Sequence, residues 1–236
     1  MKELIDLHCH TISSGHAYST VKENIDSANE KGLKYLGVSD HAPMMPGTAH
    51  IYHFNNLKVI PKVVGNVRNL LGAEVNILDY EGTVDMTEEE LKSLDYAIVS
   101  LHPPCIPFGT KEENTNAVIS AIKHPNVKVI GHLDDSRYPV DYEKVVKEAK
   151  KLGVLLELNN SSLKPNGFRV GARDNAKVLL KECEKQGAMI IFGSDSHICY
   201  DIGRFDYCKE VVKEVGFNEE LILNYNEDKI IEIFNL

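Results

Sequence analysis

Residues 4–16 read LIDLHCHTISSGH, a short apolar run followed by three histidines within nine positions. The apolar run predicts a buried β-strand that ends where the histidines begin. Residues two apart in an extended segment point the same way, so His8 and His10 share one face while Cys9 turns to the other. The spacing predicts a chelating pair at the end of a strand.

Six further apolar runs follow, and amphipathic stretches with helical spacing separate most of them. The seven strands are predicted at residues 3–8, 34–40, 73–79, 95–102, 127–133, 153–160 and 188–195. Four of the helices are predicted at residues 19–32, 112–124, 141–153 and 172–187. Right-handed crossovers would lay the helices on one face of a mostly parallel sheet. This α/β pattern favours a closed or nearly closed barrel over an open doubly wound sheet.

Polar residues at the strand ends support the barrel. Nearly every predicted strand ends in a histidine or a carboxylate, and the third is expected to begin with Glu74. The strand-end residues are His8, His10, Asp40, His41, His102, His132, Asp195 and His197. A barrel gathers strand ends in one mouth, whereas an open sheet spreads them at about 4.8 Å per strand. We therefore expect a metal site at the C-terminal ends of the strands.

A lone histidine at a strand end is more often a hydrogen-bonded core or rim residue than a metal ligand, but seven near one edge favour a cluster. These seven are His8, His10, His16, His41, His102, His132 and His197. Glu74 has apolar neighbours, which predicts a buried carboxylate that needs cationic partners, although a surface carboxylate is the alternative. Asp195 precedes His197 by two residues and repeats the spacing of His8 and His10. The remaining histidines, His50, His53 and His124, stay unassigned, with His50 and His53 as alternative rim residues.

Composition limits the functional classes. The 236 residues favour one domain, residues 1–236, and no apolar run approaches the roughly 18 residues of a membrane helix. The N-terminus lacks the basic and apolar layout of a signal peptide, so we expect a cytoplasmic protein. Five cysteines at irregular spacing suggest neither a disulfide framework nor a thiolate zinc site. The formal charge of -9 makes nucleic acid an unfavoured partner.

The histidine and carboxylate motifs resemble those of the PHP (polymerase and histidinol phosphatase) family nearly from end to end of the chain. The matching motifs are HCH with His16, SDH (Asp40, His41), GAE (Glu74), SLH (His102), GH (His132) and GSDSH (Asp195, His197). The segments ELNNSS and GSDSH most resemble the small stand-alone phosphatases of the YcdX type. The resemblance implies a distorted (β/α)7 barrel, a trinuclear metal centre, usually of zinc, and phosphoesterase activity.

The resemblance also implies how the ligands are shared among three divalent ions. It assigns His8, His10, Glu74 and Asp195 to one ion, Glu74, His102 and His132 to a second, and His16, His41 and His197 to a third. Glu74 would bridge the first two ions. Imidazole with carboxylate suits zinc, with manganese and iron(II) as alternatives, whereas magnesium prefers an oxygen shell.

Candidate substrate-binding residues follow the sixth predicted strand. Arg169 and Arg173 are expected to clamp a phosphate, with a solvated loop and a helix start paired with Asp174 as the alternative. Asn159, Asn160 and Ser161 end the one strand without a predicted ligand, so they line the pocket or orient ligating imidazoles. Three further features remain open: Asp6 and Asp40 as supports of the ligands, residues 41–54 as a lid or packed rim, and LDDSRYP (133–139) as a determinant of substrate fit.

These features predict a cytoplasmic phosphatase that acts on a small phosphorylated substrate through a metal-activated water. Asp195 and Glu74 are the predicted catalytic residues, and Asp195 is a ligand first. A nuclease or phosphodiesterase acting on terminal nucleotides is an alternative, although no basic groove is evident. The pattern is also compatible with a histidinol-phosphate phosphatase or with a non-hydrolytic metal-binding module.

Overall fold

The computed structural model describes residues 1–236. Its central sheet contains seven parallel strands in the order β1-β2-β4-β5-β6-β7-β8. They are β1 (Ile5–Asp6), β2 (Tyr35–Val38), β4 (Val67–Asn76), β5 (Tyr96–Ser100), β6 (Val127–Ile130), β7 (Leu155–Asn159) and β8 (Ile190–Gly193). A short strand, β3 (Val63–Val64), pairs antiparallel with β4.

Contacts between the two outer strands nearly close the sheet into a barrel. Beyond the ends of β1 and β8, the main chain of Ser196 exchanges hydrogen bonds with His8 and His10. Asp6 accepts a further bond from the main chain of Ser194, and the Asn224 amide bonds to Ile5 and Phe192. These bonds join the first and last parallel strands. The predicted distorted (β/α)7 barrel is confirmed.

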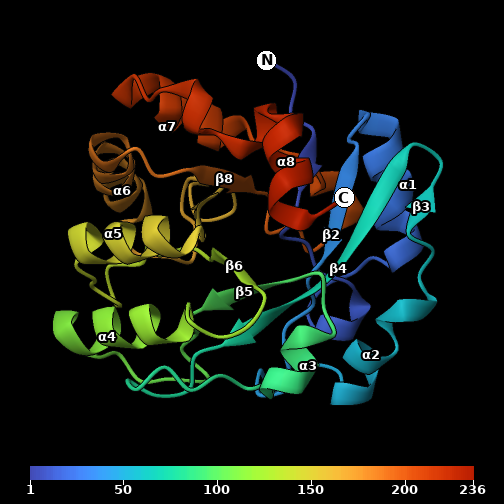
Figure 1. The fold of residues 1–236 in the computed structure, drawn as a ribbon, viewed down its shortest axis with the longest axis horizontal. Coiled ribbons are helices and arrows are strands. Elements are labelled where there is room, and N and C mark those ends of the chain that lie inside the picture. Colours follow the sequence, from blue (N-terminus) through green and yellow to red (C-terminus); the bar gives the residue numbers. More distant parts are fainter.

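Eight α-helices surround the sheet, and Figure 1 shows α4, α5 and α6 stacked in chain order along one side. The helices are α1 (Val21–Lys31), α2 (Ile51–Asn55), α3 (Glu88–Lys92), α4 (Lys111–Ala121), α5 (Tyr142–Leu152), α6 (Ala172–Gln186), α7 (Asp206–Val215) and α8 (Glu227–Phe234). Threonine–glutamate capping boxes start α1, α3 and α4, because the two side chains satisfy main-chain groups reciprocally. None of the helices combines the length and apolarity needed to cross a bilayer.

Side chains along each strand point alternately into and out of the barrel, and this alternation determines which residues lie inside it. On β5, Tyr96, Ile98 and Ser100 share one face, and on β7 Leu155 shares a face with Glu157. Tyr96, Ile98 and Leu155 belong to a buried apolar cluster at the N-terminal end of the barrel, which also contains residues of α8. The interior therefore changes from hydrocarbon to polar side chains toward the C-terminal ends of the strands.

The third parallel strand differs from its prediction. It begins at Val67 rather than residue 73 and ends at Asn76, so Glu74 lies near its C-terminal end and does not open it. Arg68 and Asn69 hid the start of the strand because they interrupt its apolar pattern. Pairing with both β2 and β5 extends β4 through these polar residues. The four predicted helices are confirmed. Their observed first residues lie within two residues of the predicted ones, and their last residues within three.

Candidate metal centre

The structure brings the nine predicted ligands together at the C-terminal end of the barrel. Glu74 lies on β4, and the other eight residues follow β1, β2, β5, β6 and β8. The imidazole rings of neighbouring histidines have centroids 4.3–6.1 Å apart. His16 lies at the exposed rim, with its ring 5.0 Å from that of His41 and 4.8 Å from that of His197.

Glu74 is at the centre of the cluster and is completely buried. Its Oε1 lies 2.9 Å from Nε2 of His132 and 3.2 Å from Nε2 of His102. Its Oε2 lies 2.7 Å from Nδ1 of His41 and 3.6 Å from Nε2 of His10. The two oxygens thus face different sets of imidazoles, as a bridging ligand requires.

Asp195 forms a second carboxylate beside Glu74. Its Oδ1 lies 3.3 Å from Nε2 of His10 and 3.5 Å from Nδ1 of His197. Asp195 has a φ of 51° and His132 a φ of 20°, both in the left-handed region that non-glycine residues rarely adopt. Strain of this kind persists where surrounding contacts hold it, often at functional sites.

Five buried polar atoms in the cluster make no hydrogen bond of normal geometry, although two of them, Nδ1 of His41 and Oε2 of Glu74, lie 2.7 Å apart. The five atoms are Nε2 of His8, Nε2 of His10, Nδ1 of His41, Nε2 of His102 and Oε2 of Glu74. Buried polar atoms normally have partners because leaving them unpaired costs free energy. Ligand atoms in four groups of these residues lie within 4.8 Å of one another. The groups are His8/His10/Glu74, His41/Glu74/His102, His10/His41/His197 and His8/His132/Asp195, so the donor set fits metal ions.

Burial and neighbouring charges set the protonation of the cluster. Burial lowers the pKa of His102 to about 4 and that of His10 to about 3, so both rings are neutral at pH 7 and offer lone pairs. Burial opposes ionisation of Glu74, but the nearby imidazoles of His102, His8 and His41 lower its pKa well below the usual range. Burial opposes protonation of His8, but the carboxylates of Glu157, Glu74 and Asp195 raise the pKa of this ring well above the usual range. His8 would therefore release a proton when it binds a cation.

Residues behind the ligands orient them. Nδ1 of His102 lies 2.7 Å from Oδ1 of Asn76. Nδ1 of His10 lies 3.2 Å from Oγ of Ser14, which donates to Asp40. The second oxygen of Asp40 lies 3.1 Å from Nε2 of His53. Hydrogen bonds of this kind fix the tautomer and direction of a ligating ring.

Glu157 is a buried residue of the site that the sequence interpretation missed. Its Oε1 lies 2.6 Å from Nδ1 of His8, and its Oε2 accepts hydrogen bonds from the main chain of His132 and from Asn159. A glutamate inside the apolar run GVLLELNN, two residues before Asn159 and therefore on the same face, was the available signal. Asn76 was missed as well, since nothing in its local sequence marks it.

Some of the predicted substrate-binding residues contact the cluster, and others contact α7 instead. Arg169 donates from Nη1 to Oδ2 of Asp195 (3.2 Å) and to Ser162 (2.9 Å), and Asn159 also donates to Asp195 (3.2 Å). Arg173 instead pairs with Glu210 and Glu214 on α7. Asn160 accepts hydrogen bonds from the main chain at the start of α7. Only Arg169 and Asn159 of this set contact the cluster.

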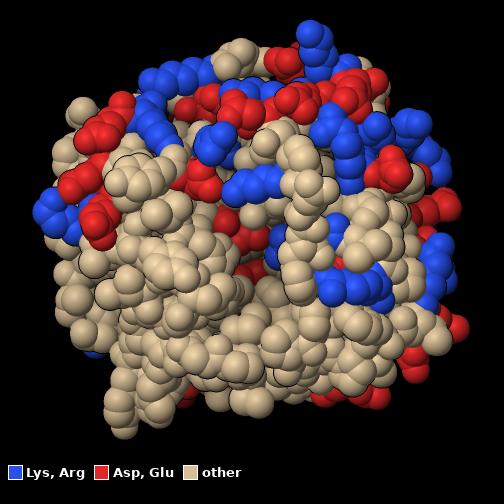
Figure 2. Space-filling view, turned by 180° about the vertical axis from the view of Figure 1, so that it is seen from behind, with Lys and Arg blue, Asp and Glu red and all other residues tan.

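A pocket of about 560 Å³ opens over the cluster. Its walls include Met45 and Pro46 from residues 41–54, which therefore form part of its rim. The remaining lining residues are His16, His41, His102, Pro103, Pro104, Ser161, Phe168, Arg169, Asp195 and His197. Figure 2 shows a hollow near the middle of one face, with acidic residues visible inside it and a broad uncharged surface below.

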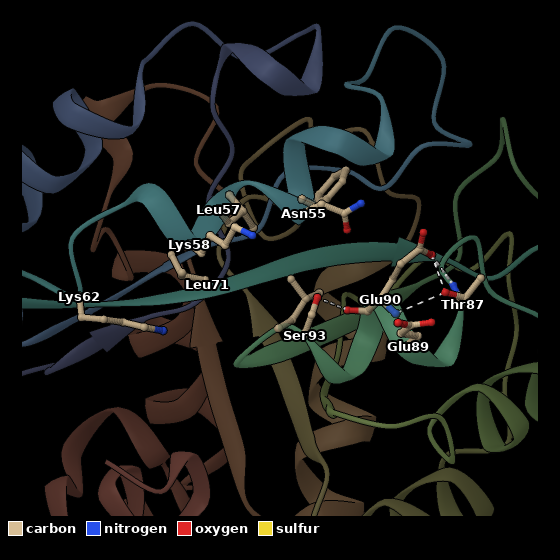
Figure 3. Close-up of a pocket in the computed structure, with 11 residues that line it drawn as sticks. Asn55, Leu57, Lys58, Lys62, Leu71, Thr87, Glu89, Glu90 and Ser93 are labelled. Carbon is tan, nitrogen blue, oxygen red and sulfur yellow. Dashed lines mark hydrogen bonds between the residues drawn. The ribbon is translucent and has the colours of Figure 1, made fainter.

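Another pocket lies outside the barrel mouth, between α2, β4 and α3, and contains none of the predicted site residues (Figure 3). Several of its polar side chains already have structural partners. Thr87 and Glu90 form the capping box of α3, and Ser93 donates to the Glu90 carbonyl. Lys62 pairs with Asp95. The mouth of the barrel is therefore the candidate site.

Comparison with known proteins gives one family. The PHP domain model matches residues 6–234. The chain is 46% identical over 231 residues to a "probable phosphatase" of Clostridium novyi, covering 98% of this chain and 94% of the relative. It is equally identical, over 232 residues and with the same coverage, to a "probable phosphatase" of Clostridium acetobutylicum. Histidinol phosphate phosphatase of Lactococcus lactis, solved with zinc, L-histidinol and phosphate, has a similar fold: the TM-score is 0.60 at 15% identity, with coverage of 92% of this chain and 95% of that one.

Proposed function

The chain belongs to the PHP domain family, and we propose that it is a metal-dependent phosphatase that hydrolyses a phosphomonoester of a small molecule. One observation carries the proposal: four imidazole nitrogens and one carboxylate oxygen converge in a buried cluster without hydrogen bonds of normal geometry. Cations would compensate these atoms, and the adjacent pocket leaves room for a substrate.

The nine clustered residues would hold three divalent ions, with zinc favoured and manganese or iron(II) as alternatives. By the sharing of ligands that the family resemblance implies, His8, His10, Glu74 and Asp195 would hold the first ion, Glu74, His102 and His132 the second, and His16, His41 and His197 the third. The contacts of Glu74 with His102 and His132 and of His16 with His197 support this sharing, whereas His41 also lies against Glu74. When bound, the ions would supply an activated nucleophile and stabilise negative charge on the phosphate oxygens. Their charge would outweigh that of the buried carboxylates and attract an anionic substrate.

Residues of the chain would position the reacting groups. Arg169 lines the pocket beside Asp195, so its planar guanidinium can bind two phosphate oxygens. Asn159 holds Asp195 from behind through its amide. Asp195 would serve first as a ligand, and Glu74 would be shared by two ions, since its two oxygens lie against different imidazoles. All five cysteines are free, which suits the reducing cytoplasm in which we expect the enzyme.

The decisive experiment compares three substrates on metal-loaded protein: a chromogenic phosphomonoester, the matching diester and a single-stranded oligonucleotide. We expect hydrolysis of the monoester and about three transition-metal ions per chain by elemental analysis. Glu74→Gln should lose both bound metal and turnover. Glu143→Gln, at an exposed position on α5, should retain both. Activity on the diester or oligonucleotide alone would replace the proposal with the nuclease alternative. A screen of phosphorylated metabolites, including histidinol phosphate, would then identify the substrate.

A further inference from the structure

An aromatic side chain stands exposed on the wall of the pocket. Phe168 lines the pocket, and its side chain is 72% exposed although neighbouring residues hold it in place. The guanidinium of Arg137 lies 4.3 Å from the centre of its ring and donates a hydrogen bond to its carbonyl. Both ring and main chain of Phe168 are thus fixed by one residue.

Arg137 is itself held in place. Its Nε and Nη2 donate to both oxygens of Asp135, a bidentate pairing that defines the plane of the guanidinium. It also lies 5.5 Å from the ring centre of Phe108. The segment LDDSRYP therefore supplies a support for Phe168, and the aromatic ring costs little further ordering when a ligand stacks on it.

The rest of the pocket offers few polar partners to a leaving group. Met45, Pro46, Pro103 and Pro104 are apolar, and apart from the predicted ligands only Ser161 and Arg169 are polar. A polyhydroxylated leaving group would lose hydrogen bonds to water here without replacing them. The faces of a planar aromatic ring form no hydrogen bonds with water, so stacking them would lose none and would bury carbon surface.

We propose that Phe168 forms a stacking subsite for a planar aromatic ring in the leaving group, so that the enzyme prefers phosphomonoesters that carry such a ring. The inference rests on the proposed phosphatase function and names its substrate class. Arg169 follows Phe168 directly and contacts Asp195, so one loop presents a ring-binding surface and a phosphate-binding cation side by side. The pocket volume of about 560 Å³ accommodates a molecule of mononucleotide size.

Adenosine 5′-monophosphate and ribose 5-phosphate make a matched test, since they share the phosphorylated ribose and the adenine ring takes the place of the anomeric hydroxyl. We expect kcat/KM to be at least about fivefold higher for the nucleotide, the fold-change that corresponds to stacking on an aromatic side chain. Phe168→Ala should bring the ratio close to one. Tyr200→Ala, which removes an aromatic residue of similar exposure outside the pocket, should retain the wild-type ratio. Equal kcat/KM values for the two substrates in the wild type would overturn the inference and leave the proposed phosphatase function standing.

A binding measurement decides the inference even where neither compound is hydrolysed and the proposed function fails. The chain contains no tryptophan, so Phe168→Trp introduces a single indole at the subsite. Adenosine should change its fluorescence saturably, whereas ribose should not. Tyr200→Trp provides the control for non-specific quenching. Absence of a saturable change in Phe168→Trp, or an equal change in the control, would overturn the subsite.

Discussion

The carboxylate of Glu157 lies 2.6 Å from Nδ1 of His8, and both side chains are buried. With Nδ1 bonded to the acid, Nε2 of His8 is left facing Glu74 at 3.4 Å, where it would offer a lone pair once a cation displaces its proton. The second oxygen of Glu157 accepts a 2.8 Å hydrogen bond from the main chain of His132. One acid thus orients one predicted ligand and supports the main chain of another.

Replacing this acid should weaken metal binding without removing a ligand. We expect Glu157→Gln to lower the affinity for zinc by about 10- to 100-fold, because the amide lacks the charge that orients His8 and raises its basicity. Competition with a chromophoric chelator measures the affinity. Glu143→Gln, at an exposed position on α5, should match the wild type. Wild-type affinity in Glu157→Gln would contradict the role assigned to the acid.

Gly193 provides the space that Glu157 occupies. A Cβ at this position would overlap Oε1 of Glu157 and lie 3.1 Å from Cβ of His8. We expect Gly193→Ala to lower the free energy of unfolding by about 1–3 kcal/mol, the usual cost of overpacking, as measured by urea denaturation. In a Glu157→Ala background the same substitution should cost less, because the overlapping carboxylate is gone. Equal costs in the two backgrounds would show that the glycine serves another purpose.

Asp134 should make stability depend on pH. Burial raises the pKa of its carboxyl to about 6, and its Oδ1 has no hydrogen-bond partner. The unfolded chain releases this proton near pH 3.8 and the folded chain only near 6, so stability is lost as pH rises through this interval. We expect Asp134→Asn to raise the free energy of unfolding of chelator-treated protein at pH 7 by roughly 3 kcal/mol, with little effect at pH 3.5.

Urea denaturation at several pH values checks this expectation. Asp135→Asn is the matched control, because the neighbouring acid is paired with Arg137 and its pKa is lowered. That substitution should produce no gain in stability at pH 7. A gain of similar size in both variants would indicate a general effect of negative charge in this segment.

Removing the metal ions should weaken the protein without unfolding it. The apolar cluster around Tyr96 packs independently of the ligands, so far-UV circular dichroism should be retained in chelator. At a free metal concentration about 100 times Kd, the melting temperature should rise by roughly 5–10 °C relative to the chelated protein. Differential scanning calorimetry measures the change. Loss of the dichroism signal in chelator would mean that the metal ions are required for the barrel itself.

The sequence was sufficient for the barrel and for the set of clustered residues because both depend on local pattern. Apolar runs define the strands, and strand ends in a barrel converge whatever the details of register. The predicted start of β4 was wrong because pairing with the neighbouring strands β2 and β5 overrides the polarity of Arg68 and Asn69. The local sequence does not distinguish Arg173 and Asn160 from Arg169 and Asn159. In the structure, however, Arg173 and Asn160 contact α7 and do not contact the cluster. Which neighbour claims a polar side chain depends on tertiary packing, which local pattern does not contain.

The hydrocarbon floor of the barrel has a kinetic consequence. Tyr96 donates a hydrogen bond to the Leu7 carbonyl there, and α8 packs beneath, so the far end of the barrel is sealed. If the protein has the proposed function, the substrate enters and both products leave through the same mouth of the barrel. The product bound deeper in the barrel must then leave after the product bound nearer the mouth. Inorganic phosphate would then leave last, and it would act as a competitive inhibitor of turnover.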